Sequence, residues 1–490
     1  MHSNVTVISE INLDAPLAWT RANLEELRLL QSLQGNILKG HGRDFTANIF
    51  FKFDAGKEIQ SRRLLRELAN FHLTDAHRQL LEVKKFKETG ESGGPFCHLA
   101  LSSKGYEALG LAAQAPPDED FQRGMQDPSS IDALKDPAIE NWESAFQEEI
   151  HCLLLAGHES ENETTELADA LVSLLEEAGC TIIHIQRGKA LFNAAGNGIE
   201  HFGYVDGRSQ PLMLVEDVEG ESLVGLSRWS PVFPLKTVLV KDPGTSDTFS
   251  FGSFLVFRKL EQNVRAFKTR EQEIADLLQL TEDDRELAGA MIVGRFEDGT
   301  PVSLSDEARG RMPPNNFNYV DDPGRRCPFH AHIRKVNPRG SGGAEPEDGE
   351  RSHAIARRGI PYEDVARCVH PDDLPEVTDI NQFIRQVQPQ LPEDGVGLLF
   401  IAYNSVIANQ FKFIQRIWAN NTSFPVQPPG PHGIDPVIGQ GVNTPNDQKL
   451  PNEWDNPDKG TNDNCSFSGF VRMKGGQYFF SPSLTFLKNL

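Results

Sequence analysis

Apolar runs of strand length alternate with a helical segment in the first half of this chain, and this order limits the folds open to it. Four such runs are predicted as strands: residues 46–53, 96–102, 152–158 and 181–188. A helix is predicted over residues 159–180, where leucines recur at helical spacing and Gly179 ends the pattern. Two successive strand–helix–strand arrangements favour a ferredoxin-like α+β unit.

A similar order recurs after residue 230. Its predicted elements are a strand leading into a helix at 249–262, strands at 352–362 and 395–404, and an amphipathic helix at 405–421. The fold class is therefore α+β, with tandem ferredoxin-like units and antiparallel sheets. We expect an N-terminal domain over residues 1–225 and a C-terminal domain over 226–490. The stretches 339–351 and 425–460 are rich in turn formers and are expected to be irregular.

Charge and hydropathy exclude several classes of protein. Of 490 residues, 70 are acidic and 48 basic, so the net charge of -22 disfavours binding to nucleic acid. The apolar run at 397–402 is far short of the roughly 20 residues of a membrane helix, so no membrane span is expected. The N-terminus lacks the pattern of a secretory signal, and the six cysteines form no CxxC pair. We therefore expect free thiols and a cytoplasmic location.

The segment "CPFHAHIRKVNPR", residues 327–339, concentrates groups that could carry chemistry. Cys327, His330 and His332 could form a partial metal site, although a zinc site would lack a fourth ligand at the usual spacing. The segment could equally be the start of a surface helix with solvated arginines. A second motif is needed to decide between these interpretations.

That second motif is "HFGYVDGRSQP", residues 201–211, in which Asp206 lies between glycines. Alone, such an aspartate indicates an ordinary turn. Together with "AHIRKVNPR" and "ARRGIPY", in this order, it resembles the dye-decolorizing peroxidase family of heme enzymes. The segments "LQGNILKGHGR", "QFKFIQRIWANN", "GIDPVIGQG" and "GGQYFFSPSLTFL" extend the resemblance over most of the chain. It implies a bacterial member of the longer-chain subgroup, with the dimeric α/β-barrel superfold and heme mainly in the second unit.

The resemblance implies a role for His332 as the proximal ligand of the heme iron, with His330 as the competing candidate. A second group must orient the imidazole. Arg334 is expected to pair with a heme propionate, because guanidinium groups bind carboxylates in bidentate fashion. For Arg339 and Arg208 a surface salt bridge is at least as good an interpretation.

On the distal side, where peroxide binds, the resemblance implies a catalytic pair of Asp206 and Arg357. Arg358 is expected to point to the opposite face of a strand. The same alternation places Leu398 and Phe400 together, and the family has apolar residues lining the pocket there. Buried strands carry such residues in any case.

The implied protein is a heme b peroxidase that reduces hydrogen peroxide and oxidises dyes and phenols by one-electron steps, with an acidic optimum. The alternative is a protein of the same superfold that binds heme or handles heme or iron, with little peroxidase activity. Relatives often have an acidic residue where this chain has Lys412, so the partner of His332 stays open. The physiological reductant, oligomeric state, packaging in a protein shell and the share of proton transfer between Asp206 and Arg357 also stay open.

Four aromatic residues are candidates for carrying electrons between the pocket and the surface. Trp418 and Tyr403 are expected near the pocket, where ordinary core packing is the simpler interpretation. Trp229 and Trp454 lie in turn-rich segments and are expected to be exposed.

Overall fold

The computed structural model describes residues 11–310, 314–365, 368–369, 374–375, 377–444 and 446–490. The first ten residues, part of the stretch judged to lack a secretory signal, therefore lie outside the described residues. In the described part of the chain, no helix is both long and apolar enough to cross a membrane.

The first unit has the strand and helix order expected from the sequence. Its elements are β1 (Phe45–Phe53), α2 (Glu58–Phe71), α3 (Ala76–Thr89), β2 (Phe96–Leu101), β3 (Cys152–His158), α8 (Glu161–Glu177) and β4 (Cys180–Lys189). The strands pair antiparallel in the order β2-β3-β1-β4, which is the ferredoxin-like arrangement. Helix α8 begins where the Ser160 side chain accepts a hydrogen bond from the Glu163 backbone, and Gly179 follows it with a φ of 79°.

The second unit repeats this arrangement with longer insertions. Its elements are β8 (Phe251–Gln262), α10 (Val264–Leu277), β10 (Ile360–Glu363), β11 (Val396–Asn404), α15 (Phe411–Phe413) with a π-helical turn (Ile414–Ala419), and β14 (Val471–Ser481). The strand order β10-β11-β8-β14 matches that of the first unit. The helix expected over 405–421 is shorter and partly π-helical, as the bond from the Asn420 N–H to the Gln415 carbonyl shows.

The two units share one sheet. Strand β14 pairs with β2, and at the other end of the path β4 lies against β10. Gly188 on β4 permits this contact, because a Cβ there would lie 2.6 Å from a methyl carbon of Ile360. The Lys189 ammonium lies 3.0 Å from the Glu363 carboxylate across the same contact. The sheet therefore closes on itself as a barrel, while the boundary at residues 225 and 226 stays a prediction.

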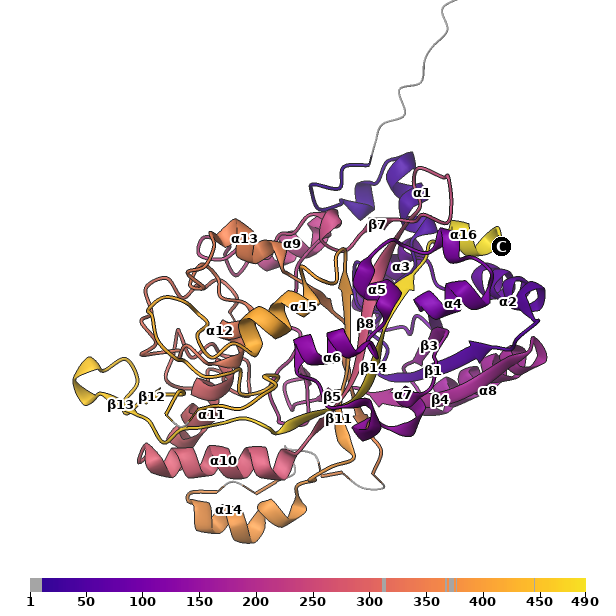
Figure 1. The fold of residues 1–490 in the computed structure, drawn as a ribbon. Helices are drawn as coiled ribbons and strands as arrows, with labels where there is room; N and C mark the ends of the chain where they lie inside the picture. The colour runs from indigo at the N-terminus through magenta and orange to yellow at the C-terminus, as the bar shows by residue number, and fades with distance from the viewer. Residues whose placement is uncertain (1–10, 311–313, 366–367, 370–373, 376, 445) are drawn as a thin grey trace, which may run out of the picture.

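Helices cover the barrel on both sides (Figure 1). In this view α2 and α8 lie to the right of the strands, and α10 lies to the lower left with α14 (Ile380–Gln386) below it. The insertions of the second unit, including α11 (Glu286–Val293), α12 (His332–Val336) and α13 (Glu347–Ser352), gather on the left. The first unit is thus compactly covered, and the second carries the extra segments that build a cavity.

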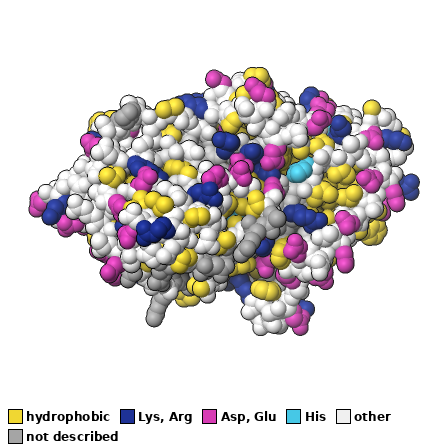
Figure 2. All heavy atoms as spheres, turned by 90° about the horizontal axis from the view of Figure 1, so that it is seen from below, with side chains coloured by type: hydrophobic (Ala, Val, Ile, Leu, Met, Phe, Trp, Pro, Cys, Tyr) yellow, Lys and Arg dark blue, Asp and Glu magenta, His cyan; other side chains and the backbone are white. Residues whose placement is uncertain are grey.

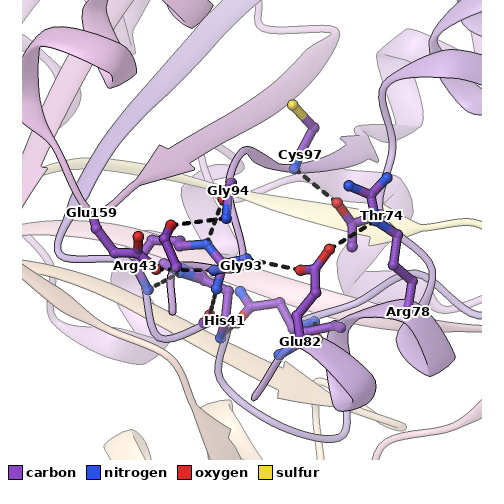
Figure 3. Close-up of polar contacts among 12 residues, drawn as sticks. His41, Arg43, Thr74, Arg78, Glu82, Gly93, Gly94, Cys97 and Glu159 are labelled. Atoms are coloured by element: carbon purple, nitrogen blue, oxygen red, sulfur yellow. Dashed lines mark hydrogen bonds and ion pairs between the residues drawn. The ribbon is translucent and has the colours of Figure 1, made fainter. Parts of the chain in front are cut away.

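The N-terminal motif at residues 33–43 fastens the chain to the first unit (Figure 3). Arg43 donates to the His41 and Gly94 carbonyls, and its Nη2 lies 2.8 Å from a carboxylate oxygen of Glu82 on α3. The Arg43 and Glu82 side chains are 4% and 14% exposed, so this ion pair is shielded from solvent. The Arg43 side chain thus joins this motif to α3 and to the segment before β2.

On the face shown in Figure 2, acidic and basic side chains of the described residues are interspersed, with apolar side chains between them.

Candidate active site

A cavity in the second unit brings the sequence motifs together. The segment joining the two units, strands β8 and β11, helix α12 and the π-helical turn supply its wall, and every lining residue lies at position 200 or later. The expected site residues on the wall are Asp206, His332, Arg357, Leu398 and Phe400.

His332, the first residue of α12, is held from behind by Asp435. Its Nδ1 lies 2.8 and 3.0 Å from the two carboxylate oxygens of Asp435, whose side chain is fully buried. The backbone N–H groups of Val437 and Ile438 donate to Asp435 Oδ1 at 2.8 and 2.9 Å. The carboxylate fixes both the tautomer and the orientation of the imidazole, and Nε2 is left as the nitrogen that can bind a metal.

Asp435 supplies the orienting group that the sequence left open. Lys412 has no part in it, since its ammonium pairs with Asp120 at 2.5 Å. Asp435 lies in the segment "GIDPVIGQG", which carried the resemblance but gave no sign of this role. The two residues are 103 positions apart, and no local periodicity links them.

Asp206 and Arg357 form an ion pair at the cavity wall. Arg357 Nη1 lies 2.6 Å from Asp206 Oδ1, and the two side chains are about one-third exposed, at 31% and 33%. Burial opposes ionisation of Asp206, but the charge of Arg357 and a hydrogen bond from the Gly207 N–H outweigh it and lower the pKa of the carboxyl below its ordinary value. The aspartate is therefore ionised and ready to accept a proton in acid.

Arg358 points elsewhere, as alternation along the strand implies. Its guanidinium donates to the backbone carbonyls of Asn36, Ile37 and Arg357 at 2.7–3.0 Å. It thereby ties the N-terminal motif to β9 (Ala356–Arg357), the short strand that carries Arg357.

Leu398 and Phe400 lie on one face of β11 and reach the cavity, while Leu399 and Ile401 between and beyond them are buried in the core. Their period of two follows from strand geometry. They give the cavity an apolar wall.

Arg334 does not line the cavity, which corrects its expected contact with a propionate. Its guanidinium donates to the carbonyls of Cys327 and Asp322, at 2.5 and 2.7 Å, and is 1% exposed. On a helix, a residue two positions on is rotated by about 200°, so Arg334 faces away from His332. Its interactions hold the 322–334 segment together.

Arg339 lines the cavity, and it makes no salt bridge with any of the residues that the structure describes. It is 2% exposed, donates to the carbonyls of Asn315 and Phe317, and lies 4.0 Å from the centroid of the Phe317 ring. Arg208 also lines the cavity and makes a bidentate ion pair with Glu221, with both distances 2.9 Å. The cavity wall thus carries guanidinium groups other than the one expected.

The zinc interpretation of Cys327, His330 and His332 fails on position. In the described part of the chain, these three side chains do not form a group whose donor atoms converge on one point. His330 is 1% exposed and lies away from the cavity, and burial lowers its pKa to about 3. His332 alone of the three faces the cavity.

Two tryptophans differ from expectation. Trp229 is 6% exposed and lines the cavity beneath the guanidinium groups of Arg339 and Arg351. Trp454 is half-buried, and its indole N–H donates to the Val302 carbonyl. A turn-rich sequence therefore did not mean an exposed ring in either case.

The cavity fits a heme group by the chemistry of its wall. It offers an imidazole nitrogen oriented by a carboxylate, apolar side chains for the faces of a macrocycle, and guanidinium groups able to neutralise carboxylates.

Comparison with known proteins identifies the family. The model of the DyP dimeric alpha+beta barrel domain matches residues 32–189. The multifunctional dye peroxidase DyP2 of Amycolatopsis is 44% identical over 490 residues, covering 98% of this chain and 100% of the relative. This chain belongs to the dye-decolorizing peroxidase family.

Solved structures agree over the whole length. The structure of the Amycolatopsis protein has a TM-score of 0.90 at 43% identity, covering 98% of this chain and 100% of its own. That of a DyP-type peroxidase from Anabaena has a TM-score of 0.87 at 37% identity, covering 98% and 99%. A dye-decolorizing peroxidase in complex with 2,6-dimethoxyphenol has a TM-score of 0.71 at 27% identity, covering 94% and 98%. The expected fold and the placement among long-chain heme peroxidases of this family are confirmed.

Proposed function

We propose that the protein binds heme b through His332 Nε2 and uses it to reduce hydrogen peroxide. The observation that carries this proposal is that His332, held from behind by Asp435, lies on the wall of the same cavity as the Asp206–Arg357 pair. When bound, heme supplies the iron centre that takes up oxidising equivalents from peroxide and passes them to donors one electron at a time.

Asp206 acts as the base toward peroxide. Cleavage of the O–O bond of hydrogen peroxide requires a proton to move from one peroxide oxygen to the departing one. Asp206 can carry this proton because its lowered pKa keeps the carboxylate ionised in acid and its side chain reaches the cavity. A histidine in its place would be protonated below its ordinary pKa of about 6.5.

Arg357 stabilises the negative charge that develops on the departing oxygen. Its guanidinium is already placed beside Asp206, so no reorganisation of the charge is needed during the reaction. The same contact keeps Asp206 ionised, so the two residues act as a unit. Arg339 can neutralise a heme carboxylate, since it lines the cavity where Arg334 does not.

The donors are dyes and phenols. Support comes from the relative solved with 2,6-dimethoxyphenol and from the name of the Amycolatopsis relative as a dye peroxidase. The Asp206–Arg357 pair argues against a protein that only carries heme, because a carrier needs no base beside the iron.

A cytoplasmic location is proposed as well. Support comes from the six cysteines, none of which is in a disulfide and five of which are buried. Fractionation of the native cells tests this location.

One absorption experiment tests the function. The purified protein is expected to show a heme Soret band that shifts when peroxide is added and returns when a phenol follows. A Soret band that peroxide leaves unchanged would favour a heme carrier, and failure to retain heme at all would overturn the proposal.

A further inference from the structure

A second group of ligand-type side chains lies outside the cavity. His201, Glu363 and Cys368 each offer one donor atom, and these atoms lie within 4.8 Å of one another. None of the three lines the heme cavity. The peroxidase mechanism above gives them no role.

The histidine is oriented in the way that a metal ligand requires. His201 is 3% exposed, and its Nε2 lies 2.9 Å from the Tyr362 carbonyl oxygen. A carbonyl can only accept, so Nε2 carries the proton and Nδ1 has the lone pair. Metal-binding histidines commonly donate their other ring N–H to such a carbonyl.

The sulfur lies close to the position that coordination needs. Cys368 Sγ is 3.9 Å from His201 Nδ1. In a tetrahedral zinc site the usual Zn–S and Zn–N lengths place these two atoms about 3.6 Å apart. The observed separation therefore needs to contract by only a few tenths of an ångström.

The carboxylate completes a mixed nitrogen, sulfur and oxygen set. Glu363 ends β10, directly after Tyr362, and now pairs with the Lys189 ammonium at 3.0 Å. A cation is thus already attracted to this carboxylate, and a divalent ion can compete for it. One thiolate, one imidazole and one carboxylate together suit zinc, which takes all three.

We propose that His201 Nδ1, Glu363 and Cys368 Sγ bind one Zn²⁺ ion, with water as the fourth ligand. Zinc binds the thiolate form of cysteine, so the thiol proton of Cys368 leaves as the Zn–S bond forms. Each bound ion therefore releases one proton from Cys368.

The site links the two segments that carry the catalytic pair. His201 lies five positions before Asp206, and Glu363 lies six positions after Arg357. A bound ion would fasten these two segments to each other beyond the contact of Asp206 with Arg357. The proposal does not depend on the peroxidase function, since the donor atoms and their spacing stand by themselves.

The test uses untagged, chelator-treated holoenzyme and Zn²⁺ alone as the probe. Calorimetry is expected to give one site per chain, and Cys368→Ser and Glu363→Gln are each expected to weaken binding at least tenfold. Glu393→Gln is the matched control, because Glu393 is 59% exposed and lies outside the group. Equal zinc affinity in wild type and Cys368→Ser would overturn the site.

A second measurement does not depend on any variant. Zn²⁺ is expected to slow alkylation of Cys368 in the wild-type protein by at least tenfold, as followed by peptide mass spectrometry. The two alkylation time courses are recorded under conditions that differ only in the presence of Zn²⁺. Unchanged alkylation at saturating Zn²⁺ would show that the sulfur is not a ligand and would reject the proposal.

Discussion

The two sides of the cavity use an aspartate in opposite ways. Asp435 is fully buried, accepts two backbone N–H groups and the imidazole of His332, and has no access to the cavity wall. Asp206 is one-third exposed and is balanced by Arg357 at the wall. A carboxylate enclosed by donors is a fixed support, whereas one at the wall can exchange protons with a small molecule. Burial therefore separates the anchoring side from the reacting side.

The largest effect is expected where the anchoring side meets the iron. His332→Ala should lose bound heme or its normal iron coordination, because the other histidine on the described cavity wall, His353, has both ring nitrogens engaged by Asn409 and Glu345. His330→Ala is the control and should keep both, since His330 lies away from the wall. Absorption and electron paramagnetic resonance spectra measure the outcome. Full heme content with unchanged spectra in His332→Ala would show that His332 does not anchor the heme.

On the reacting side, Asp206→Asn should slow peroxide activation by about 10²–10⁴-fold, the usual contribution of a general base. The pKa of Asp206 lies below its ordinary value, so the wild-type base persists as pH falls and is lost only below about 4. Wild-type dye oxidation should accordingly be best below neutrality. Steady-state pH profiles of both proteins check this, and a wild-type optimum near pH 8 would count against it.

Arg357→Leu should slow peroxide activation by about 100-fold, because loss of one charge-stabilising group is commonly worth about 3 kcal/mol. Arg358→Lys keeps a charge on the opposite face and should stay close to wild type. Stopped-flow mixing with peroxide measures both rates. Equal rates in the two variants would remove Arg357 from the reacting side.

Asp435→Asn sharpens the comparison from the anchoring side. The asparagine side chain has nearly the same shape as that of Asp435, but it is a weaker hydrogen-bond acceptor for the His332 imidazole. Such changes behind a metal ligand cost about 10- to 100-fold in metal affinity or activity. We expect faster heme loss to an acceptor protein, with a peroxide pH profile shaped like that of the wild type. A shifted pH profile would instead place Asp435 among the proton-exchanging groups.

The smallest effects are expected from the aromatic candidates. Trp229, Trp418, Tyr403 and Trp454, changed singly to Phe, should each keep oxidation of a small phenol. Trp418 and Trp229 line the cavity, so replacing one of these two should lower the rate of oxidation of a large anthraquinone dye several-fold. Tyr403 is fully buried and bonded to His98, which makes it the internal control. If every variant keeps both activities, direct access of dyes to the cavity is the better account.

Local pattern predicted much of this molecule. Strand alternation placed Leu398 and Phe400 on the cavity face and separated Arg357 from Arg358, because successive side chains of a strand point to opposite faces. The repeated order of strands and helices gave both ferredoxin-like units. These features need no knowledge of distant contacts.

Contacts between residues far apart in the chain, and the directions of some side chains, could not be predicted from the sequence. Asp435 reaches His332 from an irregular segment whose path no periodicity describes. Arg334 was misplaced because the short helix α12, with its rotation of about 100° per residue, was not foreseen at that position. Trp229 is buried by Arg339 and Arg351, which come from a different part of the sequence.

The position of β14 has a consequence for how the protein is made. It is the last strand along the chain, yet it lies inside the sheet, between β8 and β2. During synthesis the two units stay unjoined on this side until residues 471–481 have left the ribosome. Because β8 borders the cavity and pairs with β14, the cavity takes its final shape only after residues 471–481 have emerged. A substitution that disturbs residues 471–481 would therefore be felt at the cavity, through the pairing of β14 with β8.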